Sequence, residues 1–168
     1  MKVTNFEEYV LHSPKEVSRE NKEWIDTALS FISTNFPILE IGSGTGRDAD
    51  YIESKGFKVL RTDIDERFIA YQKEKVKEVS NLDILNDKMK GEYGLVFANA
   101  VLHHFDKDTI IQCLHKIKNH TKIIAFNLPN SSQINISEIQ SELKLKQLYF
   151  QKTKDWSCLL YTSPSPRD

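Results

Sequence analysis

The residues best suited to ligand chemistry form a glycine and hydroxyl run, Gly42-Ser43-Gly44-Thr45-Gly46, directly after an apolar segment. That segment, residues 38–41, predicts a short buried strand, and residues 48–55 predict a helix that ends at Gly56. Glycines have no side chain, so a ligand can approach their backbone closely. A strand, a glycine turn and a helix N-terminus together predict a site for a nucleotide-like ligand.

Three further polar residues follow predicted strands: Asp63 after residues 57–62, Asp83 after residues 78–82, and Asn99 after residues 95–98. Open α/β sheets bind ligands at the carboxyl ends of their strands, which favours a site role for Asn99. Asp63 and Asp83 have a second interpretation, as polar residues that merely close a strand.

Two adjacent histidines, His103 and His104, suggest a metal site or a general base. Adjacent residues are expected to point in different directions, so we predict no two-histidine metal pair and no metal. One of the two remains a weak candidate for a catalytic base or a substrate contact. Cys113 and His115 lie on a predicted helix, where packing and surface roles suffice.

The spacing of these elements predicts an α/β fold with helices on both faces of a mostly parallel sheet. Ser13, Pro14 and Glu16 have the types and spacing of a helix start, which predicts a first helix over residues 13–34. The other predicted elements are helices 66–75 and 106–118 and a fifth strand at 122–127.

Composition limits the classes of function. The 168 residues are 39% hydrophobic and 28% charged with a formal net charge of −1, which is typical of one globular domain and gives no case for nucleic acid or an anionic membrane. No apolar run is long enough to span a membrane, and residues 1–10 lack the apolar core of a signal peptide. Two widely separated cysteines favour a reducing cytoplasm.

After Pro129 the pattern weakens. Residues 136–149 predict a helix with at most one strand near 148–151. Residues 157–168 resemble a translated sequencing-adapter read-through, so we expect a non-native or disordered tail there and a single domain over 1–156.

Four landmarks now carry a family resemblance. The run from Glu40 to Gly46 resembles motif I of the class I S-adenosylmethionine-dependent methyltransferases. Asp63 stands where that family has an acidic residue after the second strand, and Asp83-Ile84 matches the corresponding pair after the third. Residues 93–105 resemble the motif around the fourth strand, and the resemblance covers about residues 24–130.

The resemblance implies a Rossmann-like three-layer sandwich and S-adenosylmethionine as cofactor. It implies that Glu40 organises the methionine end, that Asp63 accepts from the ribose hydroxyls, and that Asp83 and the Ile84 N–H contact adenine. The implied cofactor-binding residues are Glu40, Gly42, Ser43, Gly44, Gly46, Asp63, Ile64, Asp83, Ile84 and Asn99. Because the family sheet has seven strands and ends in an antiparallel hairpin, we expect the last strand or strands to be missing and the chain to be C-terminally truncated.

The implied activity is methyl transfer to an unidentified, small-molecule acceptor by in-line displacement, which needs no dedicated catalytic triad. An NAD(P)-dependent oxidoreductase is the first alternative, although Arg47 occupies the third glycine position of the dinucleotide fingerprint counted from Gly42. The second alternative is a cofactor-binding fragment without turnover, because strands are expected to be missing.

Overall fold

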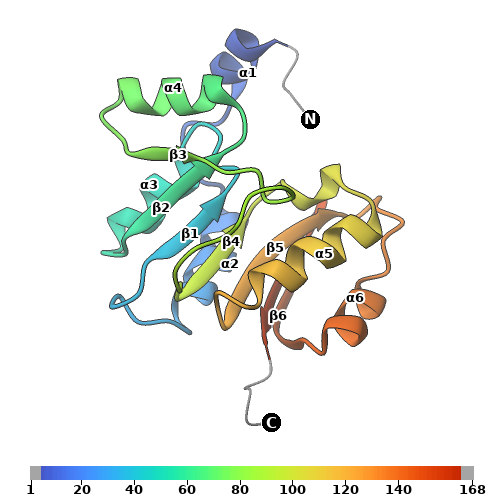
Figure 1. Cartoon of the computed structure of the whole chain (residues 1–168). Helices are drawn as coiled ribbons and strands as arrows, with labels where there is room; N and C mark the ends of the chain where they lie inside the picture. Colours follow the sequence, from blue (N-terminus) through green and yellow to red (C-terminus); the bar gives the residue numbers. More distant parts are fainter. Residues whose placement is uncertain (1–4, 164–168) are drawn as a thin grey trace.

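One seven-stranded sheet organises the chain in a computed structural model, which describes residues 5–163 (Figure 1). The strand order is β3-β2-β1-β4-β5-β7-β6, and β1 to β5 run parallel while β7 and β6 run antiparallel. The strands are β1 Ile38–Ile41, β2 Val59–Asp63, β3 Val79–Asn81, β4 Leu95–Ala98, β5 Ile123–Pro129, β6 Lys146–Lys152 and β7 Trp156–Thr162. The predicted α/β class with a mostly parallel sheet is confirmed.

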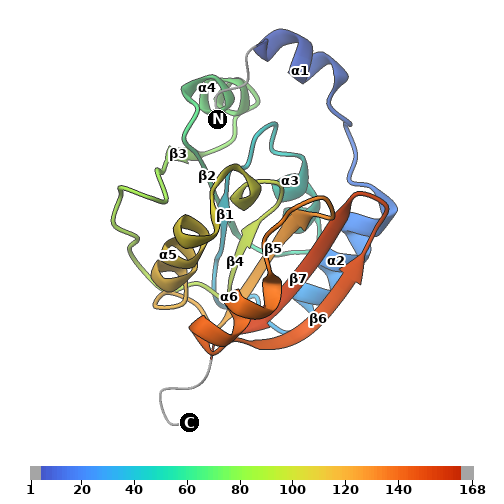
Figure 2. The ribbon, with the colours of Figure 1, turned by 90° about the vertical axis from the view of Figure 1, so that its right-hand side faces the viewer.

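Helices cover both faces of this sheet. The helices of the chain are α1 Phe6–His12, α2 Arg19–Leu29, α3 Arg47–Ser54, α4 Glu66–Glu74, α5 Lys107–Ile117 and α6 Ile136–Leu143, with a 3-10 turn, η1, at Leu102–His104. Of these, α1 buries no residue and contacts α4 through Phe6 and Tyr9. Figure 2 shows α5 and α6 on one side of the central strands and α2 and α3 on the other. Within residues 5–163, no helix combines the length and the apolar character that a membrane crossing requires.

The central strand β1 is buried at all four positions and separates two apolar clusters. Leu39 and Ile41 pack into the cluster that contains α5 and α6, whereas Ile38 packs into the one that contains α2 and α3. Because side chains alternate along a strand, Glu40 is directed to the face of Ile38. The apolar pattern of β1 therefore carries one carboxyl group into the interior.

The expectation of missing closing strands is wrong. β7 lies between β5 and β6, with Ala125 opposite Leu160 and Phe150 opposite Leu159. Positions 157–161 of β7 are all buried, so both of its faces meet the core and its sequence shows no alternation. The expected disordered tail is therefore wrong for residues 157–162, and residues 164–168 lie outside the described part of the chain.

The N-terminal region also differs from its prediction. Asn5 caps α1 by accepting from the Glu8 N–H, and Ser13 is the residue that ends this helix, not the start of a longer one. Ser18 begins α2 by accepting from the Asn21 N–H. Of the expected helix over 13–34, only Arg19–Leu29 is α-helical, and a separate helix, α1, precedes that range.

Candidate functional site

The glycine turn after β1 is held in a left-handed backbone conformation. Gly42, Gly44 and Gly46 have φ angles of 69°, 54° and 82°. A Cβ atom added at Gly42 would lie 2.5 Å from Val101 Cγ2, and one added at Gly46 would lie 2.5 Å from Gln72 Oε1. A Cβ atom at Gly44 would meet nothing within 4 Å. Of the three glycines, Gly44 is therefore the one whose backbone a ligand can approach.

A cavity of about 270 Å³ lies against this turn, at the carboxyl ends of the central strands. Its lining comes from the turn and the start of α3, from the ends of β4 and β5, from the N-terminal segment and from β7: Gly42, Ser43, Gly44, Thr45, Arg47, Asp48, Asn99, Ala100, Asn127, Tyr9, Ser13, Pro14, Asn21 and Trp156. A larger hollow of about 800 Å³ over β2 and β3 contains none of the predicted site residues. The smaller cavity is therefore the candidate site.

A buried carboxyl group, that of Glu40, lies on β1 just before the glycine turn. Glu40 is 2% exposed, and its Oε2 has no hydrogen-bond partner among the described residues. Burial, followed by the nearby charge of Asp48, raises the pKa of the Glu40 carboxyl well above its usual range. Such a group is stabilised by a cationic or hydrogen-bond-donating ligand, because an unpaired buried carboxylate is costly.

Asp63 fastens the turn to the end of β2. Its Oδ2 accepts from the Gly44 N–H at 2.8 Å and its Oδ1 accepts from the Asp65 N–H at 2.9 Å. Burial raises the pKa of this carboxyl, although hydrogen bonds from the backbone of Asp65, Gly44 and Ile64 act in the opposite direction. A carboxylate has about four lone-pair sites, so Asp63 keeps acceptor capacity for a ligand. The neighbouring Ile64 is 55% exposed and offers an apolar surface.

The predicted adenine-contacting pair, Asp83 and Ile84, does not line this cavity. The Asp83 carboxylate accepts from the Leu85 N–H at 2.9 Å and from the Asn86 side chain at 2.7 Å. The hydrogen bond from Asn86 is the main reason that the pKa of Asp83 is lowered. Ile84 is buried. Asp83 therefore closes a turn, and its contact with a ligand stays a prediction.

A chain of amide hydrogen bonds crosses the cavity floor. Asn99 Nδ2 donates to Asp48 Oδ2 at 2.6 Å, and Asn127 Nδ2 donates to Asn99 Oδ1 at 2.7 Å. Asn127 Oδ1 accepts from the Ala100 N–H at 2.6 Å, where Ala100 has a left-handed φ of 56°. Asn99 thus lines the candidate cavity, and its contact with a cofactor stays a prediction. The sequence analysis missed Asp48 and Asn127, although the position of Asn127 near the end of a predicted strand was a usable signal.

His103 and His104 stack on each other with ring centroids 3.9 Å apart, because both belong to the single turn η1. The expectation that they point in different directions is wrong. The His103 ring also contacts the Trp156 ring, with a centroid distance of 5.2 Å and an interplanar angle of 76°. Trp156 lines the cavity, so the histidine pair packs against a residue of the cavity lining. Burial lowers the pKa of both histidines.

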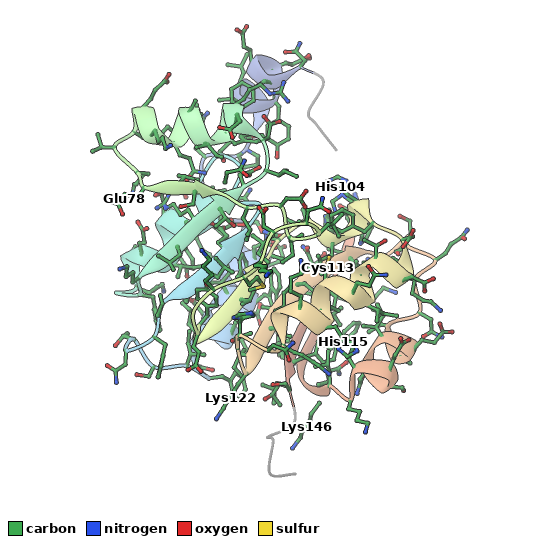
Figure 3. The ribbon with its side chains drawn as sticks, in the orientation of Figure 1. Glu78, His104, Cys113, His115, Lys122 and Lys146 are labelled. Atoms are coloured by element: carbon green, nitrogen blue, oxygen red, sulfur yellow. The ribbon has the colours of Figure 1, made fainter. Side chains whose placement is uncertain are left out.

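Figure 3 shows His104 near the upper end of the sheet, away from Lys122 at the opposite end. Lys122 immediately precedes β5, so the histidines lie toward the end of the sheet where the parallel strands finish. Among residues 5–163, no group of three His, Cys, Asp or Glu side chains is placed to hold a metal ion.

Comparison with known proteins gives one family match and two curated relatives. A methyltransferase domain family matches residues 39–123. The probable S-adenosyl-L-methionine-dependent methyltransferase TehB of Haemophilus influenzae Rd is 26% identical over 139 residues, and a second TehB, from strain 10810, is 25% identical. The alignments cover 74% of this chain and 47% of each relative, so the chain spans about half the length of the curated relatives it matches.

Solved structures with the same fold include proteins from three bacteria. Magnesium protoporphyrin IX methyltransferase from Synechocystis, with bound SAM, has a TM-score of 0.76 at 12% identity and covers 96% of this chain and 92% of its own. TehB from Haemophilus influenzae has a TM-score of 0.69 at 15% identity, covering 93% and 65%. A TehB-like methyltransferase from Corynebacterium glutamicum has a TM-score of 0.71 at 16% identity, covering 92% and 91%. At these identities the likeness establishes the fold.

Proposed function

Because the chain belongs to the methyltransferase domain family, in its class I S-adenosylmethionine-dependent branch, we propose that it methylates a small-molecule acceptor by in-line displacement. S-adenosylmethionine is the cofactor of this family. The observation that carries the proposal is the open face of Gly44 above the buried Glu40 carboxyl, at the carboxyl ends of the parallel strands.

The residues of the site fit this cofactor. The unpartnered Glu40 Oε2 lies near the carboxyls of Asp48 and Asp63, and Asp48 lines the cavity. This group of acidic side chains suits a ligand that carries positive charge. Gly44 leaves room for the ligand against the backbone. We assign Glu40 and the turn from Gly42 to Gly46 to the amino-acid end of the cofactor.

The adenosine end is assigned to the ends of β2 and β3. Asp63 keeps acceptor capacity for the ribose hydroxyls beside its backbone hydrogen bonds. The exposed Ile64 side chain and the segment of Asp83 and Ile84 are assigned to adenine.

When bound, S-adenosylmethionine would supply a methyl group activated by a positively charged sulfur; the acceptor lone pair would bond to the methyl carbon as the S–CH3 bond breaks, and S-adenosylhomocysteine would be the leaving group. This chain's task is to align the acceptor and to exclude water. The hydrogen-bonded amides of Asn99 and Asn127 present a polar floor for that alignment, and Trp156 walls the cavity beside it.

A protic acceptor must also lose a proton. Burial lowers the pKa of His103 and His104, so both are neutral bases at neutral pH. His103 Nδ1 is buried without a hydrogen-bond partner among the described residues. His103 and His104 are not among the residues that line the cavity, so we assign the acceptor's proton to neither of them.

The alternatives receive less support. The oxidoreductase alternative is not supported, because the matching family and the named relatives are methyltransferases. The argument for a fragment without turnover rested on missing strands, and both strands of the closing hairpin are present in the sheet. We also propose a cytoplasmic location, since Cys113 and Cys158 are free thiols buried in the core.

A thermal-shift titration tests the cofactor assignment. At a hundredfold excess over the dissociation constant, S-adenosylhomocysteine is expected to raise the Tm by roughly 5–10 °C. Stabilisation by NAD alone would overturn the proposal. Release of S-adenosylhomocysteine with a panel of small hydroxyl, amine and thiol acceptors then tests turnover, and binding without release from any acceptor would favour the fragment.

A further inference from the structure

Gln72 on α4 is a fully buried amide that reaches the glycine turn from beneath. Its Nε2 donates to Ser43 Oγ at 2.7 Å and to the Gly44 carbonyl oxygen at 2.9 Å. One side chain therefore holds two consecutive residues of the turn, including the glycine whose opposite side is open.

Arg61 on β2 fixes the orientation of this amide. Its Nη1 donates to Gln72 Oε1 at 3.1 Å, and since a guanidinium can only donate, the amide oxygen must face Arg61 and the amide nitrogen must face the turn. Arg61 is fixed in turn by Asp50 and Glu53 of α3, whose carboxylates lie 2.6 and 2.7 Å from its Nη2. The Gln72 amide is thus held in a single hydrogen-bonding orientation.

The space at Gly46 is a second, independent observation that the turn is packed against Gln72 and Arg61. A Cβ atom at Gly46 would lie 2.5 Å from Gln72 Oε1 and 2.7 Å from Arg61 Nη1. The missing side chain at this position makes room for the Gln72–Arg61 pair, not for a ligand. The turn is therefore shaped around the buried amide.

We propose that Gln72 is a positioning residue for cofactor binding, which presents the open face of Gly44 to the amino-acid end of S-adenosylmethionine. This inference rests on the proposed function. A turn that is already held in its binding conformation loses less freedom when the ligand binds, so removing the Gln72 hydrogen bonds weakens binding without removing a ligand contact.

Two substitutions at Gln72 test the hydrogen bonds that its Nε2 donates to the turn separately from the one that its Oε1 accepts from Arg61. Gln72→Met keeps the length of the side chain and removes every hydrogen bond, whereas Gln72→Glu keeps an acceptor for Arg61 and loses both donors to the turn. We expect the Kd for S-adenosylhomocysteine to rise about tenfold in both variants, because each loses the two hydrogen bonds that Gln72 donates to the turn. Gln140→Met on α6, away from the turn, is the matched control and should leave the Kd unchanged.

A shorter ligand distinguishes positioning from a general loss of structure. 5′-Methylthioadenosine has the adenosine end of the cofactor but no amino-acid end. If Gln72 positions the turn, the ratio of the two Kd values, measured by calorimetry well below the Tm, changes about tenfold, because only S-adenosylhomocysteine loses affinity. An equal loss for both ligands, or no loss for either, would overturn the inference.

The same titrations keep the two proposals apart. Failure of the wild type and of Gln140→Met to bind S-adenosylhomocysteine contradicts the proposed function. Normal binding by the wild type together with unchanged binding by the Gln72 variants contradicts only the positioning role. If both Gln72 variants fail to fold, Ser43→Ala removes the hydroxyl acceptor from the turn's side, and an unchanged ratio of Kd values in that variant counts against the inference.

Discussion

At the scale of single residues, the three glycines of the turn serve different purposes, and alanine substitution separates them. Gly44→Ala should cost about 1–2 kcal/mol for the left-handed backbone and also place a Cβ atom in the space assigned to the cofactor. Gly46→Ala should destabilise the fold more, because its Cβ atom also collides with Gln72 and Arg61. Urea unfolding and calorimetry with S-adenosylhomocysteine measure the two effects.

Gly56 offers a matched control for Gly44. It has a φ of 88°, and a Cβ atom there also meets nothing within 4 Å, but it does not line the cavity. Gly56→Ala should therefore lose a similar amount of stability and keep its affinity for the ligand. Equal affinities in the two variants would contradict the placement of the ligand against Gly44.

Asp63 is predicted to have two roles: it holds the glycine turn by hydrogen bonds and it binds the ribose of the cofactor. Asp63→Ala removes two hydrogen bonds to backbone N–H groups and the carboxylate assigned to the ribose hydroxyls. Charge-assisted hydrogen bonds contribute about 1.5–3 kcal/mol, so the Kd for S-adenosylhomocysteine should rise about 10–100-fold. Asp108→Ala, at an exposed position on α5, is the control, and an unchanged Kd for Asp63→Ala by calorimetry would refute the ribose role.

The sequence predicted the site residues that follow strands, and it missed those that only tertiary packing brings to the site. Glu40 lies within β1 and Asn99 directly follows β4, and both strands have clear apolar patterns, so the place of these residues in the sheet follows from topology. Asp48 and Gln72 lie within helices, where a polar residue is ordinarily solvated. Their burial becomes visible only when α3 and α4 are packed against the turn.

At the scale of elements, the parallel strands were predictable and the closing hairpin was not. β1 and β4 are short runs buried at every position, which is the pattern of a central parallel strand. β6 is a mostly exposed edge strand with charged ends, and its pairing with β7 contains an irregularity between Gln147 and Tyr149. An edge strand without regular alternation resembles the end of a helix, which explains the predicted helix over 136–149.

The packing of β7 can be tested with one substitution. Leu160 is fully buried in the cluster beneath α2, so Leu160→Ala should lower the free energy of unfolding by about 2–5 kcal/mol. Phe150→Ala on the neighbouring β6 is the control, because Phe150 is 45% exposed and should cost less despite its larger size. Urea unfolding of both variants gives the comparison, and a neutral Leu160→Ala would mean that the hairpin is not part of the core.

At the scale of the whole molecule, folding is coupled to protonation through Glu40. Burial raises its folded-state pKa above the ordinary 4.5, so the folded protein binds more protons than the unfolded chain in this range. The contribution of Glu40 to stability is therefore complete below about pH 4.5 and declines as the pH rises toward the folded-state pKa. Glu40→Gln removes this decline, so its stability relative to the wild type should increase with pH in urea titrations.

Glu53 is a control for Glu40, because its pKa is shifted in the opposite direction. Burial alone would raise its pKa, but hydrogen bonds from Arg61 and Lys77 outweigh burial and lower it. Its contribution is present above pH 4.5 and is lost as the pH falls through the lowered pKa. Glu53→Gln should therefore be less stable than the wild type at neutral pH and approach it in acid. Parallel pH profiles for the two variants would contradict the raised pKa of Glu40.

Ligand binding should also change the protonation of the Glu40 carboxyl. The ammonium group of the zwitterionic amino-acid end, assigned to the Glu40 side of the turn, favours the ionised carboxylate, so binding should lower the pKa of Glu40 and release a proton when the pH lies below its raised folded-state value. Calorimetry of S-adenosylhomocysteine in buffers of different ionisation enthalpy counts that proton. The release should disappear in Glu40→Gln and persist in Glu53→Gln, whereas equal release in all three proteins would place the cationic group away from Glu40.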